Sequence, residues 1–336
     1  MAAHTISQRL HNGDALLLDG GTGSELQRRG ADVLKGAEDR LKAWSATANL
    51  EYADVVQQVH SDYLRVGADI ITSNNFWTTP TRLDSIGERH AWRTYATAAI
   101  RNAVEARNAM HQEAYVAGGI AAPSLQGSMS PTSPVSDAHA LGPEAYRREW
   151  ADHAKLLADE GADLILAEYV GFIEDCVEAV DGCAEAGVPV FLGVRHIQDD
   201  GAMQYGESLI DLASALAGHP VDAVLLMCSN PENISVGLPI LREAFAGPVG
   251  AYPNLGYNPT GPIANRPTLT NQKPSAGVDI LQNADYYPSR MAEFAGEWKR
   301  VGAQIIGGCC ASGPEHVAAM YPVIKEGEIK TIESPT

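Results

Sequence analysis

Short apolar runs alternate with longer amphipathic stretches along the chain. The runs are rich in Leu, Ile, Val and Ala and predict strands buried on both faces, at 15–19, 69–73, 115–119, 163–168, 189–194, 222–227, 248–252 and 303–307. Between several of them, apolar residues recur at helical spacing, for example at 51–66, 143–160 and 171–186. Strands that alternate with helices predict parallel β-α-β units.

A small motif precedes four of the predicted strands. It consists of Gly or Pro, then Ala or Val, then Asp or Gln, at Gly67-Ala68-Asp69, Gly161-Ala162-Asp163, Pro220-Val221-Asp222 and Gly302-Ala303-Gln304. A glycine in the first position is typical of the left-handed residue that ends a helix. Each instance therefore predicts the end of a helix followed by a strand.

Eight such units that close on themselves form a (β/α)8 barrel. We expect a single α/β domain over 1–336, because no linker or low-complexity tract divides the chain. An open, doubly wound sheet is the alternative. The glycines of DGGTGSEL at 19–26 lack the G-x-G-x-x-G spacing of a dinucleotide-binding turn, so they give no support to that function.

Two connections are long and rich in Pro, Gly, Ser and Asn, at 121–143 and 253–285. Both follow the carboxyl ends of predicted strands, which is where barrel enzymes build their active sites. They are candidates for lids or substrate walls, and the alternative is that they are surface excursions without a role.

Polar and reactive side chains stand at the ends of the predicted strands. A closed barrel would bring these ends together on one rim, and the residues are Asp19, Asn74, Glu168, Arg195, His196, Cys228, Tyr252, Asn254, Cys309 and Cys310.

Composition narrows the range of partners. The 42 acidic and 24 basic side chains give a formal charge of −18, which argues against nucleic acid and anionic membranes, because both attract clustered Lys and Arg. The same charge suits a cationic small molecule. No apolar run approaches the ~20 residues that span a bilayer, and the first residues lack the pattern of a secretory signal. We therefore expect a cytoplasmic protein.

The five cysteines are an odd number and do not form a dense disulfide framework. Cys176 and Cys183 lie on one face of the predicted 171–186 helix and are expected to pack against the barrel. Cys228, Cys309 and Cys310 would meet on the rim, where three thiolates would hold Zn²⁺ and leave its fourth position open. The alternative is that Cys228 fills the core and that Cys309 and Cys310 are a chance pair.

Several motifs, in order along nearly the whole chain, resemble the homocysteine S-methyltransferase family, which includes betaine- and S-methylmethionine-dependent enzymes. They are LLLDGGTGSELQRRG (16–30), AWSA (43–46), GADIITSNNF (67–76), ILAEY (165–169), Cys228 after a strand, and GGCCASGPEH (307–316). The resemblance implies a zinc-dependent barrel with Cys228, Cys309 and Cys310 as ligands.

The resemblance also implies a homocysteine site formed by Asp19, Gly20, Gly21 and Glu168. Backbone amides of the glycine turn would hold the carboxylate of the amino acid, and the two acidic side chains would pair with its ammonium group. The alternatives are that Asp19 orders its own glycine turn and that Glu168 is the partner of Arg195. Tyr169 matches a tyrosine that approaches zinc in some relatives when substrate is absent.

A methyl donor of this kind carries a sulfonium or quaternary ammonium group, which aromatic faces stabilise. The resemblance places Trp44 and Trp77 on the donor side, with Phe76 and Tyr252 as weaker candidates. The alternative for Trp77 is that it packs beneath the rim.

The expected reaction is transfer of a methyl group from an S-methylmethionine, S-adenosylmethionine or betaine type of donor to the zinc-bound thiolate of homocysteine, giving methionine. The chain departs from the family pattern at Leu226-Met227, where relatives usually have a small residue and Asn, and at Ala311, where they have Gly. The alternatives are therefore methyl transfer to another thiol or selenol, or from another onium donor, and an inactive barrel that binds zinc or an amino acid. A homo-oligomer is compatible with the sequence.

Overall fold

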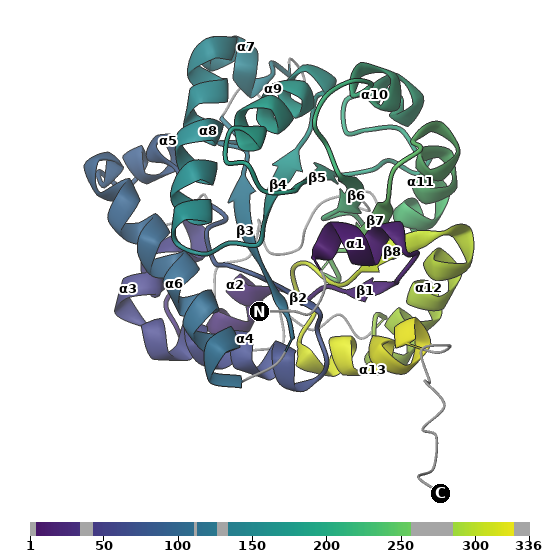
Figure 1. Ribbon diagram of the computed structural model, residues 1–336, viewed down its shortest axis with the longest axis horizontal. Coiled ribbons are helices and arrows are strands. Elements are labelled where there is room, and N and C mark those ends of the chain that lie inside the picture. Colours follow the sequence, from purple (N-terminus) through teal and green to yellow (C-terminus); the bar gives the residue numbers. More distant parts are fainter. Residues whose placement is uncertain (1–4, 34–42, 111–112, 126–133, 257–284, 326–336) are drawn as a thin grey trace, which may run out of the picture.

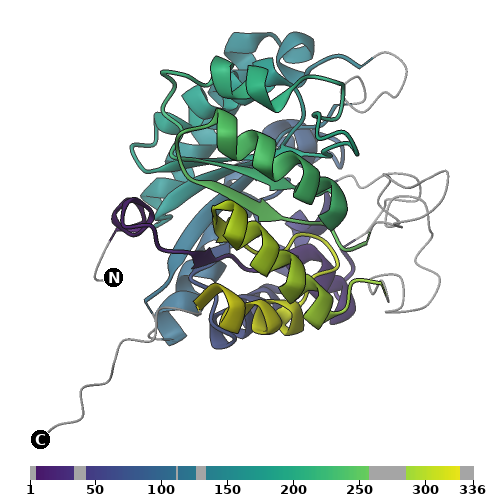
Figure 2. The ribbon, with the colours of Figure 1, turned by 90° about the vertical axis from the view of Figure 1, so that its right-hand side faces the viewer.

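A computed structural model describes residues 5–33, 43–110, 113–125, 134–256 and 285–325. All eight predicted strands are present and parallel, in the order β1-β8-β7-β6-β5-β4-β3-β2 (Figures 1 and 2). They are β1 Leu16–Leu17, β2 Ile70–Thr72, β3 Tyr115–Ala121, β4 Leu164–Val170, β5 Val190–Arg195, β6 Ala223–Met227, β7 Val249–Tyr252 and β8 Ala303–Ile306.

A bridge between Leu18 and Ile70 joins the two edge strands, so the sheet curls into a nearly closed barrel. This confirms the (β/α)8 barrel over the open sheet. The first strand is shorter than predicted because its regular pairing with β8 covers Leu16 and Leu17, after which Leu18 forms a single bridge to Ile70. The fourth is longer because its register shifts between Ala167 and Val170, which keeps Glu168 and Tyr169 within the strand.

Helices surround the barrel as an outer layer (Figure 1). They are α2 Thr22–Arg28, α3 Ala48–Glu51, α4 Ala53–Arg65, α5 Pro80–Asp84, α6 Trp92–Met110, α7 Asp137–Leu141, α8 Pro143–Asp159, α9 Ile173–Ala184, α10 Leu209–Ala215, α11 Pro231–Ala244, α12 Pro288–Val301 and α13 Pro314–Lys325. The remaining helix, α1 Ile6–His11, does not belong to this layer. The helices predicted at 51–66, 143–160 and 171–186 correspond to α4, α8 and α9.

The repeated motif shapes the amino ends of the strands. Gly67, Gly161 and Gly302 have φ of 98°, 107° and 105°, the left-handed conformation predicted for them.

The aspartates of the motif have a common role. Each carboxylate accepts a hydrogen bond from a backbone N–H near the start of the preceding strand. Leu17 donates to Asp69 at 2.7 Å, Val116 donates to Asp163 at 2.8 Å and Val190 donates to Asp222 at 2.8 Å. Neighbouring strands are thereby fixed to one another in pairs.

The core has an inner and an outer part. The inner part fills the barrel with side chains such as Leu16, Tyr115 and Phe191. Two residues of α1, Ile6 and Leu10, pack into it, and this helix lies at one end of the barrel (Figure 2). The outer part lies between the strands and the helices and contains Cys176 and Cys183, both fully buried in α9 as expected.

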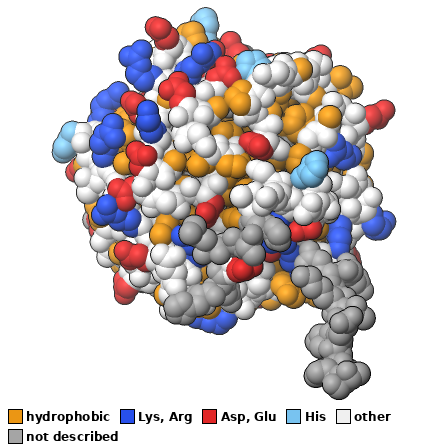
Figure 3. Space-filling view, in the orientation of Figure 1, with side chains coloured by type: hydrophobic (Ala, Val, Ile, Leu, Met, Phe, Trp, Pro, Cys, Tyr) orange, Lys and Arg blue, Asp and Glu red, His pale blue; other side chains and the backbone are white. Residues whose placement is uncertain are grey.

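The two long connections are described only in part. Residues 126–133 of the first and 257–284 of the second lie outside the described residues, so the prediction that they form lids remains a prediction. Basic and acidic side chains are interspersed on the face shown in Figure 3. In the described part of the chain, no helix is long and apolar enough to cross a membrane.

Candidate active site

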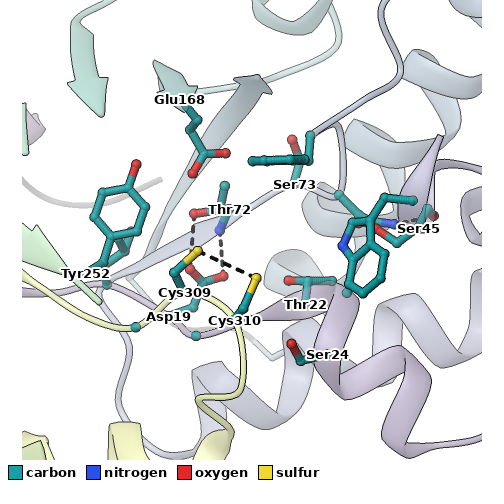
Figure 4. Close-up of a pocket in the computed structure, with 18 residues that line it drawn as sticks. Asp19, Thr22, Ser24, Ser45, Thr72, Ser73, Glu168, Tyr252, Cys309 and Cys310 are labelled. Carbon is teal, nitrogen blue, oxygen red and sulfur yellow. Dashed lines mark hydrogen bonds between the residues drawn. The ribbon is translucent and has the colours of Figure 1, made fainter. Parts of the chain in front are cut away.

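Three cysteines come together at the carboxyl ends of the strands. Cys228 follows β6, and Cys309 and Cys310 follow β8. Their three sulfur atoms lie within 4.8 Å of one another, and those of Cys309 and Cys310 are 3.9 Å apart (Figure 4). Tetrahedral zinc with Zn–S bonds of ~2.3 Å requires sulfurs roughly 3.8 Å apart. The donor set and its spacing therefore fit a zinc ion.

The three thiols share their hydrogen bonds. Hydrogen bonds with the Cys228 and Cys309 side chains lower the pKa of Cys310, whereas hydrogen bonds with Cys228 and Cys310, together with burial, raise the pKa of Cys309. The side-chain amide of Asn254 also donates to the Cys228 sulfur, at 3.4 Å. Because like charges this close disfavour one another, ionised thiols in the cluster would gain from a bound cation.

Glycines allow the two signature loops to pack backbone against backbone. A Cβ on Gly21 would lie 2.5 Å from the carbonyl oxygen of Cys309, and one on Gly307 would lie 2.7 Å from that of Asp19. The N–H of Gly308 donates to Asp19 at 2.8 Å, and that of Gly21 donates to Ser312 at 2.9 Å. The DGG and GGCC motifs are therefore the two sides of one close contact that positions the cysteines.

Three successive strand ends carry strained backbone. Tyr169, His196 and Cys228, at the ends of β4, β5 and β6, have φ of 63°, 54° and 47°. A residue other than glycine in this region costs roughly 1–3 kcal/mol, and such residues cluster at functional sites. The strain directs three side chains that carry chemistry to one part of the rim.

Two carboxyl groups are buried beside the cysteines. Asp19 accepts hydrogen bonds from the N–H and hydroxyl of Thr72 on β2, at 2.7 and 3.0 Å. Burial nevertheless raises its pKa to about 8. Burial and the nearby Asp19 raise the pKa of Glu168 to about 8, against the opposing effect of a hydrogen bond with Tyr252. Both groups would gain from a cationic ligand, because it would compensate their negative charge.

One pocket collects most of the predicted site residues (Figure 4). Its lining includes all four residues predicted to bind homocysteine, two of the three cysteines, and the aromatic residues Trp44, Phe76 and Tyr252. Cys228 lies just behind this lining, with 4% of its surface exposed.

Trp77 and Tyr169 lie outside the pocket lining. The indole N–H of Trp77 donates to the carbonyl of Ala122 at 3.2 Å, and the guanidinium of Arg82 lies 3.6 Å from the ring centroid. The Tyr169 hydroxyl is 2.9 Å from Nε2 of His196. Burial and the adjacent Arg195 lower the pKa of His196 to about 3, so that imidazole is neutral near pH 7.

Sequence reasoning missed Thr72 and Ser24. The hydroxyl of Ser24 accepts a hydrogen bond from the N–H of Ala311 at 2.9 Å and thereby supports the loop of Cys309 and Cys310. Thr72 lies one residue before the end of the strand predicted at 69–73, so its position near the rim was a usable signal. Nothing in the local sequence indicates the contact of Ser24 with a loop near the other end of the chain.

Similarity to known proteins identifies the family of this chain. The sequence model of the family described as Homocysteine S-methyltransferase matches residues 16–324. The chain belongs to the homocysteine S-methyltransferase family. The methyltransferase class of enzyme predicted from the sequence is thereby confirmed.

Relatives and a solved structure span most of this family member. The homocysteine S-methyltransferase of Escherichia coli K12 is 30% identical over 325 residues, which cover 91% of this chain and 94% of that protein. The selenocysteine methyltransferase of Astragalus bisulcatus is 26% identical and is covered completely, with 99% of this chain. The crystal structure of the metallated homocysteine methyltransferase MmuM from Escherichia coli superposes with a TM-score of 0.69 at 25% identity, covering 91% of this chain and 95% of that one.

Proposed function

We propose that this protein transfers a methyl group from a sulfonium or quaternary ammonium donor to the thiol of homocysteine, giving methionine, and that it uses zinc held by Cys228, Cys309 and Cys310. The convergence of three sulfurs within 4.8 Å, at a pocket that also contains Asp19 and Glu168, carries the proposal. When bound there, zinc would supply the positive charge that keeps an acceptor thiol ionised near neutral pH.

The chain's own residues would orient the acceptor. Asp19 and Glu168 would pair with its ammonium group, whose charge favours the ionised carboxylates. Gly20 and Gly21 would form the wall beside its carboxylate. Because the N–H of Gly21 is already donated to Ser312, this glycine would contribute close backbone approach instead of a hydrogen bond.

The donor would lie against Trp44 and Phe76, which line the pocket and are partly exposed. Aromatic faces attract onium groups. The thiolate would attack the methyl carbon in line, the new S–C bond would form as the bond to the onium atom breaks, and the donor would leave neutral. Tyr169 and Trp77 would support this wall from behind, since Tyr169 contacts both Phe76 and Trp77 at ring-centroid distances of 5.4 and 6.4 Å.

The donor and the acceptor are tested together. Zinc-loaded protein would be incubated with S-methylmethionine, S-adenosylmethionine or betaine and with homocysteine, cysteine or selenocysteine, and products would be identified by mass spectrometry. Selenocysteine is included because the selenocysteine methyltransferase named above matches nearly the whole chain.

We expect methionine from homocysteine with at least one donor. Methylation of selenocysteine alone would replace homocysteine by a selenol acceptor. Calorimetric binding of homocysteine without turnover of any donor would contradict catalysis and favour an amino-acid-binding barrel. We further propose a cytoplasmic location, where reducing conditions would maintain the five free cysteines.

A further inference from the structure

We propose that the hydroxyl of Tyr252 is a specificity-determining group for the ammonium end of the acceptor, and that Gly193 provides the space that positions it. This inference rests on the proposed function, because it takes the acceptor to be a thiol amino acid. It gives Tyr252 a role on the acceptor side, in contrast to the donor-side role predicted from the sequence.

Gly193 has no side chain and so leaves a space in strand β5, which we call a notch, and this notch holds the Tyr252 hydroxyl. A Cβ on Gly193 would lie 2.2 Å from the Tyr252 hydroxyl oxygen and 2.9 Å from the sulfur of Met227. Atoms cannot approach so closely, so any other residue at 193 would displace the Tyr252 ring. Tyr252 ends β7 and is 2% exposed, which leaves it little room to move elsewhere.

The hydroxyl has two acceptors within reach. It donates to the thioether sulfur of Met227 at 3.1 Å. The Glu168 carboxyl group lines the same pocket and is close enough to interact electrostatically with the hydroxyl. A second notch makes room for that carboxylate, since a Cβ on Gly119 would lie 2.7 Å from Oε2 of Glu168. Figure 4 shows Tyr252 and Glu168 on the same side of Cys309.

The two acceptors differ in strength, and this difference links Tyr252 to the ligand. A thioether is a weak acceptor, whereas an ionised carboxylate is a strong one. An ammonium group paired with Glu168 would fix the charge on that carboxylate, and the Tyr252 hydroxyl would then donate to it. A ligand without an ammonium group would leave the hydroxyl on Met227. Tyr252 would therefore strengthen the binding of amino acids in particular.

Calorimetry with two thiols tests this role. L-homocysteine and 4-mercaptobutanoate share the thiol and the carboxylate, and only homocysteine carries an ammonium group. We expect Tyr252→Phe to weaken homocysteine binding roughly ten-fold, as for loss of a hydrogen bond to a charged group. Binding of 4-mercaptobutanoate should change less than about two-fold. The control is Tyr115→Phe, the same change in the inner core at the opposite end of the strands, which should leave both affinities unchanged.

A second pair of variants tests the notch. Gly193→Ala should reduce the preference for homocysteine in the otherwise unchanged protein, because it displaces the hydroxyl. In the Tyr252→Phe background the same change should leave the remaining preference unaltered, since the displaced atom is absent. An equal loss of both ligands in Tyr252→Phe, or no loss of either, would overturn the inference.

The outcomes also separate this inference from the proposed function. If the unchanged protein prefers homocysteine but transfers no methyl group, the proposed function fails and the role of Tyr252 stands. If it shows no preference for homocysteine over 4-mercaptobutanoate, the role of Tyr252 is refuted whatever the activity.

Discussion

The two ends of the barrel use carboxyl groups in opposite ways. At the amino ends of the strands, Asp69 accepts from the N–H of Leu17 and pairs with Arg9 and Lys325 at 3.0 and 2.8 Å. At the carboxyl ends, burial raises the pKa values of Asp19 and Glu168 to about 8. The first arrangement completes the fold, whereas the second lowers the stability of the unliganded protein and suits a cationic ligand.

The backbone shows the same division. The helix ends that lead into the strands use glycine where left-handed φ is needed, as at Gly67 and Gly161, so the turn carries no strain. The rim uses Tyr169, His196 and Cys228 in that conformation. Reactive side chains thus occupy rim positions whose backbone conformation glycine would adopt with less strain. The residues that stabilise the barrel are therefore separate from those proposed to take part in the reaction.

The largest expected effect comes from removing a sulfur from the rim. Cys310→Ser should lower zinc affinity and methyl transfer by more than about 100-fold, because losing a ligand should exceed the 10–100-fold effect of losing its supporting contacts. Metal content by mass spectrometry and turnover would be measured on the same sample. Cys183→Ala, in the buried part of α9, is the control and should keep its zinc. Full activity of Cys310→Ser would show that the cluster is structural.

Placing a side chain between the two signature loops should have the next largest effect. The Cβ of Gly21→Ala would meet the backbone oxygen of Cys309 at 2.5 Å, and that oxygen cannot turn aside as a flexible side chain would. We expect a loss of about 3 kcal/mol in the free energy of unfolding and weaker zinc binding. The control is Gly296→Ala on α12, where the Cβ would meet only the Val323 side chain, at 3.1 Å. Equal unfolding midpoints in denaturant for the two variants would contradict the loop contact.

A change at the opposite end should affect stability alone. Asp69→Asn removes a carboxylate that pairs with both Arg9 and Lys325, whereas the pair of Arg9 with Asp14 remains, and we expect a loss of about 2 kcal/mol in the free energy of unfolding. The zinc-loaded variant should keep the kcat and KM of the original protein at a temperature where both are folded. A selective rise in the KM for homocysteine would break the proposed division between the two ends.

The smallest expected effect is a gain in folding stability, in contrast to the losses predicted above. The pKa of Glu168 is raised in the fold from 4.5 to about 8, so its contribution to stability is fully present below pH 4.5 and is lost as pH rises toward about 8. Glu168→Gln should remove this loss and stabilise the zinc-free protein by about 1–2 kcal/mol at pH 8, with little change at pH 4. Denaturant unfolding at both pH values measures it. If Glu168→Gln is less stable than the original protein at pH 8, the predicted gain in stability is wrong. If its KM for homocysteine does not rise, Glu168 does not bind the acceptor.

The sequence predicted the fold because its evidence is local and repeated. Each strand is an apolar run, and Gly67, Gly161 and Gly302 end helices as expected. The rim cysteines follow from the barrel, since its topology brings strand ends together. The sequence does not show that Arg82 lies on the Trp77 ring, or that Gly193 makes room for Tyr252. Those contacts join residues from different strands and loops, and they depend on side-chain packing that the order of residues does not indicate.

X-ray absorption at the zinc edge tests the central claim most directly. The protein would be loaded with one zinc per chain and measured with and without homocysteine. We expect three sulfur neighbours at about 2.3 Å in the free protein and four with homocysteine bound. A sulfur count that stays at three when homocysteine is bound, or a zinc ion without sulfur neighbours, would contradict it.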